Sequence, residues 1–399
     1  MTVSLHAGIG ALLTATVLCG QAPEPDPAAR RAAASNDVAF ALQRALRDPT
    51  ANLVFSPTSI AGAFAVVHGC LEGETRAEVA RALRFDVHGE AFADAQRALT
   101  ALLAAEGGPL TSASRMWLAE GAAYRRETLA RLGREFGTAP ETVDFRDAEA
   151  ARGRINAWTA EATRTRIPEI LPTGVLDASV RFVIVDAVHF KDRWASKFDP
   201  ALTKPRPFAV AADDGKPVGD ATAVPMMSAR IPARLGADAD GSYLELDYAS
   251  GAYAFFVALP AGGNLRALED RLTSTTFAAK RAAMKPIDKA SVRIPRFRAD
   301  ADLKLHRRGL RELGMSKVFA SSTDWRPLID DALAISYVGH KAVVQVDEEG
   351  TEAAAATVAV GKRGGAPKED FVADRPFLYA VVHKATGAVV FLGRCLRPE

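Results

Sequence analysis

The stretch from His340 to Val360, HKAVVQVDEEGTEAAAATVAV, decides how the rest of the chain is interpreted. It begins as an apolar, strand-like run, passes through three acidic residues and ends in a run of small side chains. Residues 361–370, GKRGGAPKED, combine glycine and proline with charges, which is typical of an exposed loop. Taken alone, Ala353–Ala356 behind Thr351 favours a short capped helix, because alanine leads the helix scale and threonine is a good N-cap.

Length and composition allow a large core without defining a function. At 399 residues and 48% apolar content, length alone favours two or three domains, although one large domain stays open. A net charge of +2, with acids and bases interspersed, gives no indication of a nucleic-acid partner. The three cysteines, Cys19, Cys70 and Cys395, do not form a disulfide framework, and we expect buried or inert thiols.

Residues 1–35 differ from the rest and are expected to form a leader. Residues 7–19 are an apolar run, too short to span a bilayer but typical of a signal-peptide core, and a Pro-rich polar linker follows at 21–31. The absence of Lys and Arg from residues 1–10 argues against this assignment. We expect a secreted, periplasmic or extracellular protein without a transmembrane span, and a lipoprotein leader ending at Cys19 is the alternative.

Past the leader, one α+β domain over residues 36–399 is expected. Ser56 and Pro57 suit the start of a helix, and the apolar run 60–67 makes that helix buried on all sides. A helix is also expected at 36–46. Strand-like runs dominate the later chain, at 181–190, 252–259, 291–297, 333–346 and in a hairpin of 377–382 with 388–392. Helices early and strands late indicate an α+β domain with large sheets.

Several ordered motifs between Asn36 and Pro398 resemble those of the serpin family of protease inhibitors. They include SPTSI at 56–60, INAW at 155–158, VHFK at 188–191, IPRF at 294–297, RPF at 375–377 and FLGR at 391–394. EEGTEAAAAT at 348–357 is similar to the hinge of the reactive-centre loop in inhibitory members. The resemblance implies a serpin-like single domain with large mixed β-sheets, helices and an exposed reactive-centre loop at about 350–370.

The resemblance also implies a function, the inhibition of serine proteases, and by extension of cysteine proteases, as a suicide substrate. The protease cuts the loop and is trapped as an acyl-enzyme while the hinge inserts into the main sheet. The expected partner is a trypsin-like or a subtilisin- or elastase-like protease in a covalent 1:1 complex with a monomer. A non-inhibitory carrier or chaperone is the alternative. The hinge is assigned to Gly350, Thr351, Glu352, Ala353, Ala354, Ala355, Ala356 and Thr357.

The reactive bond stays open between three neighbouring positions. Counting from Gly350 as the family usually does places the cut between Gly364 and Gly365. A cut one residue earlier, between Arg363 and Gly364, would present an arginine to a trypsin-like pocket, and we favour it slightly. Lys362–Arg363 is the third choice.

Three departures from the family pattern bear on the site. Asp186 stands where asparagine is usual, in a sheet-opening cluster with Ser56 and His340, so the cluster could respond to pH. A neutral, hydrogen-bonded core histidine is the alternative. Gln345 replaces an acidic residue and puts one family ion pair in doubt. Arg97 is the only base in the helix expected at 92–105, so we expect no glycosaminoglycan site there.

No motif of an enzyme is found. The chain lacks a Gly-x-Ser-x-Gly elbow, a His-Glu-x-x-His pair, a phosphate-binding Gly loop and cysteine pairs at zinc spacing. Asp347–Glu349 is interpreted as a solvated turn rather than as an acid/base pair. We therefore expect no catalytic residues, no cofactor and no metal.

Overall fold

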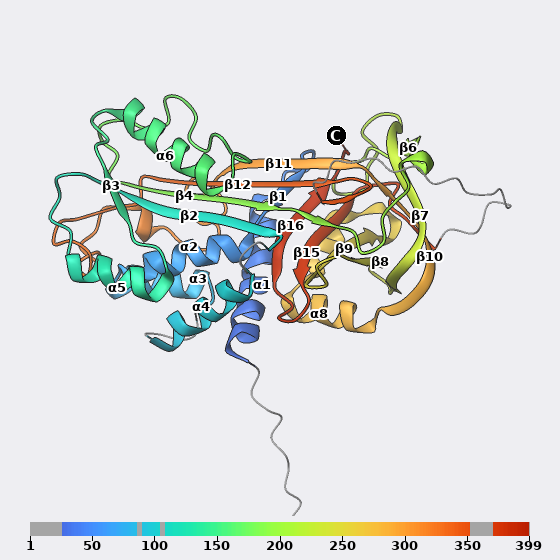
Figure 1. Ribbon diagram of the computed structural model, residues 1–399, viewed down its shortest axis with the longest axis horizontal. Helices are drawn as coiled ribbons and strands as arrows, with labels where there is room; N and C mark the ends of the chain where they lie inside the picture. The colour runs from blue at the N-terminus through green and yellow to red at the C-terminus, as the bar shows by residue number, and fades with distance from the viewer. Residues whose placement is uncertain (1–25, 86–89, 104–107, 352–369, 399) are drawn as a thin grey trace, which may run out of the picture.

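The computed structural model describes residues 26–85, 90–103, 108–351 and 370–398. In these parts the chain forms two large β-sheets with eight α-helices around them (Figure 1). The expected α+β class with large mixed sheets is confirmed.

A seven-stranded sheet runs along the long axis of the molecule (Figure 1). In spatial order its strands are β3 (Glu141–Val143), β2 (Leu110–Ala119), β4 (Phe182–Phe190), β12 (Tyr337–Val346), β13 (Gly350–Thr351) and β5 (Asp192–Arg193), and β11 (Phe297–Lys304) also pairs with β12. The two central strands β4 and β12 are parallel over seven residue pairs. Strand β11 takes one edge of β12, so β4 and β13 share the other edge.

A nine-stranded sheet packs against one end of the first. Its strands are β1 (Leu53–Phe55), β16 (Val389–Cys395), β15 (Phe377–His383), β9 (Tyr253–Pro260), β8 (Gly241–Asp247), β7 (Thr222–Ala237), β10 (Lys285–Pro295) and β14 (Phe371–Val372), and β6 (Lys204–Phe208) pairs with β7. Aromatic and aliphatic side chains of both sheets form a common core that includes Phe190, Phe297 and Tyr379. This core fixes one end of the seven-stranded sheet.

Helices cover both faces of the seven-stranded sheet (Figure 1). The helices are α1 (Pro27–Leu46), α2 (Pro57–Gly69), α3 (Gly73–Ala82), α4 (Glu90–Leu103), α5 (Arg126–Phe136), α6 (Ala148–Ala162), α7 (Leu265–Arg271) and α8 (Ser274–Ala283), with 3-10 turns at Pro200–Leu202, Ala261–Gly263 and Lys317–Phe319. Alternate residues of β4 pack to opposite sides, with Ile184 in the core that includes α2 and Val183 in the core under α6. All nine residues of β4 are therefore buried, which explains its unbroken apolar sequence.

Most of the expected elements are found near the expected residues. Ser56 caps α2 as predicted, because its side chain accepts a hydrogen bond from the backbone N–H of Ser59. The first helix differs: α1 begins at Pro27, so residues 27–35, expected in the leader, form its first turns. Proline at the first helical position and the alanines behind it favour this early start.

Candidate functional site

The first two residues of the expected hinge already lie inside the seven-stranded sheet. Gly350 and Thr351 form β13, in which Thr351 pairs with Val346 of β12 and with Asp192 of β5. Strand β5 follows β4 after Lys191, so β13 occupies the place where β4 and β12 separate. We call the residues around it, Thr351, Tyr248, Trp194 and Glu348, the hinge seat.

Backbone and side chains in the hinge seat fit closely. A Cβ atom at Gly350 would lie 2.1 Å from the carbonyl oxygen of Asp192, so only glycine allows this approach. Thr351 is completely buried, and its hydroxyl lies 2.6 Å from the hydroxyl of Tyr248. The Tyr248 ring stacks on Trp194 with centroids 4.8 Å apart. Burial raises the pKa of Tyr248 well above its usual value, so its hydroxyl stays protonated and neutral beside Thr351.

Glu348, expected in a solvated turn, is buried instead. Its carboxylate accepts a hydrogen bond of 2.6 Å from the hydroxyl of Thr203 and one of 2.5 Å from Nη2 of Arg296. Burial alone would raise the pKa of Glu348, but these hydrogen bonds hold it below its usual value. The interpretation of Asp347–Glu349 as a solvated turn is therefore wrong at its central residue, because partners distant in sequence satisfy the charge.

Trp194 and Phe198 hold the backbone of the same segment. The backbone N–H of Trp194 donates to the carbonyl oxygen of Glu349 at 2.9 Å, and its indole N–H donates to the carbonyl oxygen of Asp347 at 2.7 Å. The N–H of Phe198 donates to the carbonyl oxygen of Glu348 at 3.0 Å, and Lys197 pairs with Glu349. The turn that leads into the hinge is thus fixed to the chain that follows β4.

The second predicted group, Ser56, Asp186 and His340, is brought together beneath the sheet. Asp186 of β4 and His340 of β12 are paired in register. Nε2 of His340 accepts a hydrogen bond of 3.0 Å from the backbone N–H of Ser56, and Nδ1 lies 2.8 Å from Oδ2 of Asp186. The other carboxylate oxygen accepts a hydrogen bond from the hydroxyl of Ser59. His340 and Asp186 are both almost completely buried.

This geometry determines which nitrogen of His340 carries the proton. Nε2 faces an N–H donor, so it must be an acceptor, and the ring proton sits on Nδ1 and is donated to Asp186. A second proton on Nε2 would face the N–H of Ser56. The neutral histidine is therefore the form that fits this cluster, and the pH response of the cluster stays a prediction.

The hinge seat and the cluster of Ser56, Asp186 and His340 are connected by strand β12. His340 and Val346 are six residues apart on β12, or about 20 Å at roughly 3.3 Å per residue. Strands β4 and β12 are paired with each other from Val183 opposite Tyr337 to His189 opposite Val343. A strand that entered from the hinge seat would have to separate these pairs and reach the cluster.

Other predicted residues lie elsewhere or outside the described part of the chain. Hinge residues Glu352 to Thr357, the alternative capped helix and the candidate reactive residues Arg363, Gly364 and Gly365 lie outside it. Gln345 is 3.5 Å from Arg298, whose ion pair is with Asp300 instead. Cys70 and Cys395 are both buried, as predicted, and burial raises the pKa of Cys70 to about 12.

Within residues 26–85, 90–103, 108–351 and 370–398, no three metal-ligating side chains are grouped as a metal site requires. No helix of these parts is long and apolar enough to cross a membrane.

Comparison with known proteins agrees with the motifs. The family model described as "Serpin (serine protease inhibitor)" matches residues 33–398. The leukocyte elastase inhibitor of Sus scrofa is 33% identical over 382 residues, covering 92% of this chain and 99% of the relative. The human plasminogen activator inhibitor 2 is 32% identical, covering 88% and 94%. A serpin-like protein of Methanosarcina acetivorans is 29% identical, covering 92% and 86%.

Solved structures share the fold at lower identity. Human thyroxine-binding globulin, solved in complex with thyroxine, superposes with a TM-score of 0.81 at 23% identity and covers 94% of this chain and 100% of that structure. Maspin superposes with a TM-score of 0.81 at 22% identity and covers 93% and 100%. The family match across nearly the whole chain, together with relatives above 30% identity, shows that the chain belongs to the serpin family.

Proposed function

We propose that this chain inhibits serine proteases as a suicide substrate, with a reactive-centre loop at about 350–370 as bait and Gly350 to Thr357 as the hinge of that loop. Its relatives include proteins named as inhibitors of leukocyte elastase and of plasminogen activator. The observation that carries the proposal is the position of Thr351, buried between β12 and β5 at the point where β4 and β12 separate. A strand growing from Thr351 would enter the sheet between those two strands.

The sequence after Thr351 suits this path. Side chains alternate along a strand, so one side of the inserted strand would consist of Thr351, Ala353, Ala355, Thr357 and Ala359. All five are small and uncharged, so they can cover a packed core without the overpacking cost of about 1–3 kcal/mol. About fourteen residues at roughly 3.3 Å each would move an attached protease about 45 Å along the sheet.

The energetics favour cleavage as the trigger. The parallel pairs of β4 and β12 would be exchanged for two new ladders, one on each side of the inserted strand. Before cleavage, residues 352–369 are tied at both ends, to β13 in one sheet and to β14 in the other, which limits how far they can enter. Cutting the loop removes this tether, so the inserted form becomes accessible.

Incubation with trypsin, subtilisin and elastase tests the proposal. A covalent 1:1 complex that survives denaturing electrophoresis is expected with at least one of them. Mass spectrometry of the released fragment then decides between Arg363–Gly364, which we favour, Gly364–Gly365 and Lys362–Arg363. Rapid cleavage by all three without any trapped complex would instead leave a carrier or chaperone function, the alternative.

We also propose that the chain is exported and acts as a monomer. Export is supported only by the apolar run 7–19 and the Pro-rich stretch behind it, and the names of the relatives add no support. Fractionation of the producing cells, with N-terminal sequencing of the mature protein, tests export and the lipoprotein alternative together.

A further inference from the structure

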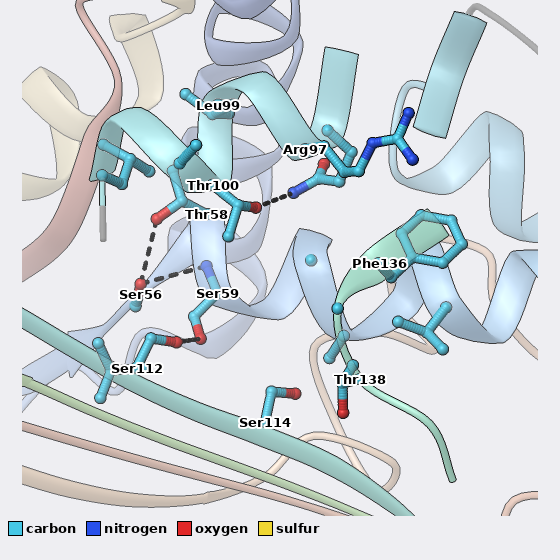
Figure 2. A pocket seen from close by; sticks show the side chains of 18 of the residues that line it. Ser56, Thr58, Ser59, Arg97, Leu99, Thr100, Ser112, Ser114, Phe136 and Thr138 are labelled. Carbon is cyan, nitrogen blue, oxygen red and sulfur yellow. Dashed lines mark hydrogen bonds between the residues drawn. The ribbon is translucent and has the colours of Figure 1, made fainter. Parts of the chain in front are cut away.

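A cavity of about 550 Å³ lies between α2, α4, β2 and the end of α5 (Figure 2). Small residues of α2 and β2 line it, among them Ser59, Gly62 and Ala63 of α2 and Ser112 and Ser114 of β2. Larger side chains at these positions would fill it. The cavity is open to solvent, so a small molecule can enter without unfolding of the surrounding elements.

The lining is apolar on its walls and carries hydroxyl groups on its floor. The walls are formed by Val66, Leu99, Leu103, Leu110, Phe136 and Val188. On the floor the hydroxyls of Ser59 and Ser112 bind each other at 2.9 Å (Figure 2). Most of the cavity lining can therefore contact an apolar group of a ligand, and binding would remove both apolar surfaces from water.

The charged side chains among the described lining residues are all basic. Arg97 and Arg134 line the cavity, and no carboxylate does so among its described residues. Arg97 is paired with Asp94 and donates to the carbonyl oxygen of Arg134. Arg134 is exposed and has no carboxylate partner in the described parts of the chain. Its guanidinium is thus the group left to receive an anion.

We propose that this cavity binds a small amphipathic anion, with its apolar body against the leucine side chains and its carboxylate at Arg134. The volume lies within the range of roughly 300–1,000 Å³ that is usual for small-molecule sites. No carboxylate is found among the described lining residues, which disfavours a cation of the same shape, and the apolar walls disfavour a small inorganic anion. Binding to the intact protein requires neither cleavage nor loop insertion, so the proposal stands apart from protease inhibition.

Calorimetric titration of the intact protein with decanoate, below its micelle concentration, tests the proposal. Saturable 1:1 binding is expected, and decyltrimethylammonium, which has the same chain with a cationic head, should bind at least tenfold more weakly. Arg134→Gln should weaken decanoate binding about tenfold, because it removes a charge-assisted hydrogen bond. Arg126→Gln on the same helix removes an equal charge away from the cavity and should leave the affinity within twofold.

A second pair of variants tests the location. Ala101 lines the cavity and is exposed, whereas its neighbour Leu102 is 46% exposed and does not line it. Ala101→Trp should block decanoate binding, and Leu102→Trp should not. Absent binding by the wild type, equal affinity for the two head groups, or unchanged binding by both Arg134→Gln and Ala101→Trp would each overturn the proposal.

Discussion

Replacing Thr351 with arginine separates recognition by a protease from insertion of the hinge. Thr351 is completely buried, and its hydroxyl lies 2.6 Å from that of Tyr248. A guanidinium does not fit at this completely buried position, and burying its charge unpaired would cost several kcal/mol. We therefore expect β13 to leave the hinge seat in the Thr351→Arg protein, while the rest of the sheet stays intact.

The size of two effects can be estimated: the loss of stability in the uncut protein and the slowing of hinge insertion. In the uncut protein the change removes one hydrogen bond, worth about 0.5–1.5 kcal/mol, and leaves the buried Tyr248 hydroxyl unpaired, at about 1–3 kcal/mol. The thermal midpoint should thus fall by only a few degrees. During insertion the arginine must be buried at the first step, and about 4 kcal/mol at this step would slow insertion about a thousandfold.

The assay compares covalent complex with cleaved inhibitor on a denaturing gel, using a protease that the wild type traps. Thr351→Arg should be cut at nearly the wild-type rate, since residues 361–365 are unchanged, but should release the protease. Glu352→Arg is the matched control, because strand alternation turns residue 352 to the opposite side of the inserted strand. Equal yields of complex from wild type and Thr351→Arg would refute insertion from this residue.

Three further changes test the packing around the hinge and the cluster. Gly350→Ala should displace β13 and raise the rate of proteolysis near residue 350, measured by limited digestion, because a Cβ atom there meets backbone at 2.1 Å. Glu348→Gln should lower the free energy of unfolding by about 1–2 kcal/mol at pH 7, since it weakens the hydrogen bond from Arg296. In the folded state the pKa of Glu348 is lowered from 4.5, so its contribution to stability is present above pH 4.5 and is lost as the pH falls through the lowered pKa. The melting temperature of Glu348→Gln should therefore depend less on pH in this range than that of the wild type. Equal pH profiles of the two proteins would contradict this reasoning. Asp186→Asn should raise the thermal midpoint by a few degrees, because it removes a buried charge beside a neutral His340, and a lower midpoint would show that the charge is needed.

The fold could be predicted from the sequence where local pattern and tertiary environment agree. Ser56 and Pro57 carry their own helix-start signal, and the apolar strand β4 reads directly as a strand covered on both faces. The helix start at Pro27 was missed because a Pro-rich polar stretch resembles a linker, although proline is equally suited to the first turn of a helix.

The hinge seat could not be predicted in this way, because its contacts join residues far apart in the chain. The local sequence around Glu348 is typical of an exposed acid. Its partners Thr203 and Arg296 are distant in sequence and come to lie beside it only in the folded protein. Tyr248 likewise gives no local signal that its hydroxyl meets Thr351, 103 residues later. Glu348 and Arg296 lie in the motifs at 348–357 and 294–297, but membership in a motif does not identify the contact between them.

The thermal midpoint of nicked protein tests the central claim most directly. Protein cut between residues 361 and 365 by a protease that is not trapped should melt far above intact protein, because Thr351 to Ala359 gain ladder hydrogen bonds and packing between β4 and β12. An ordinary protein cut in a loop melts at the same temperature or lower. A nicked protein that melts no higher than the intact one would contradict insertion and the inhibitory function built on it.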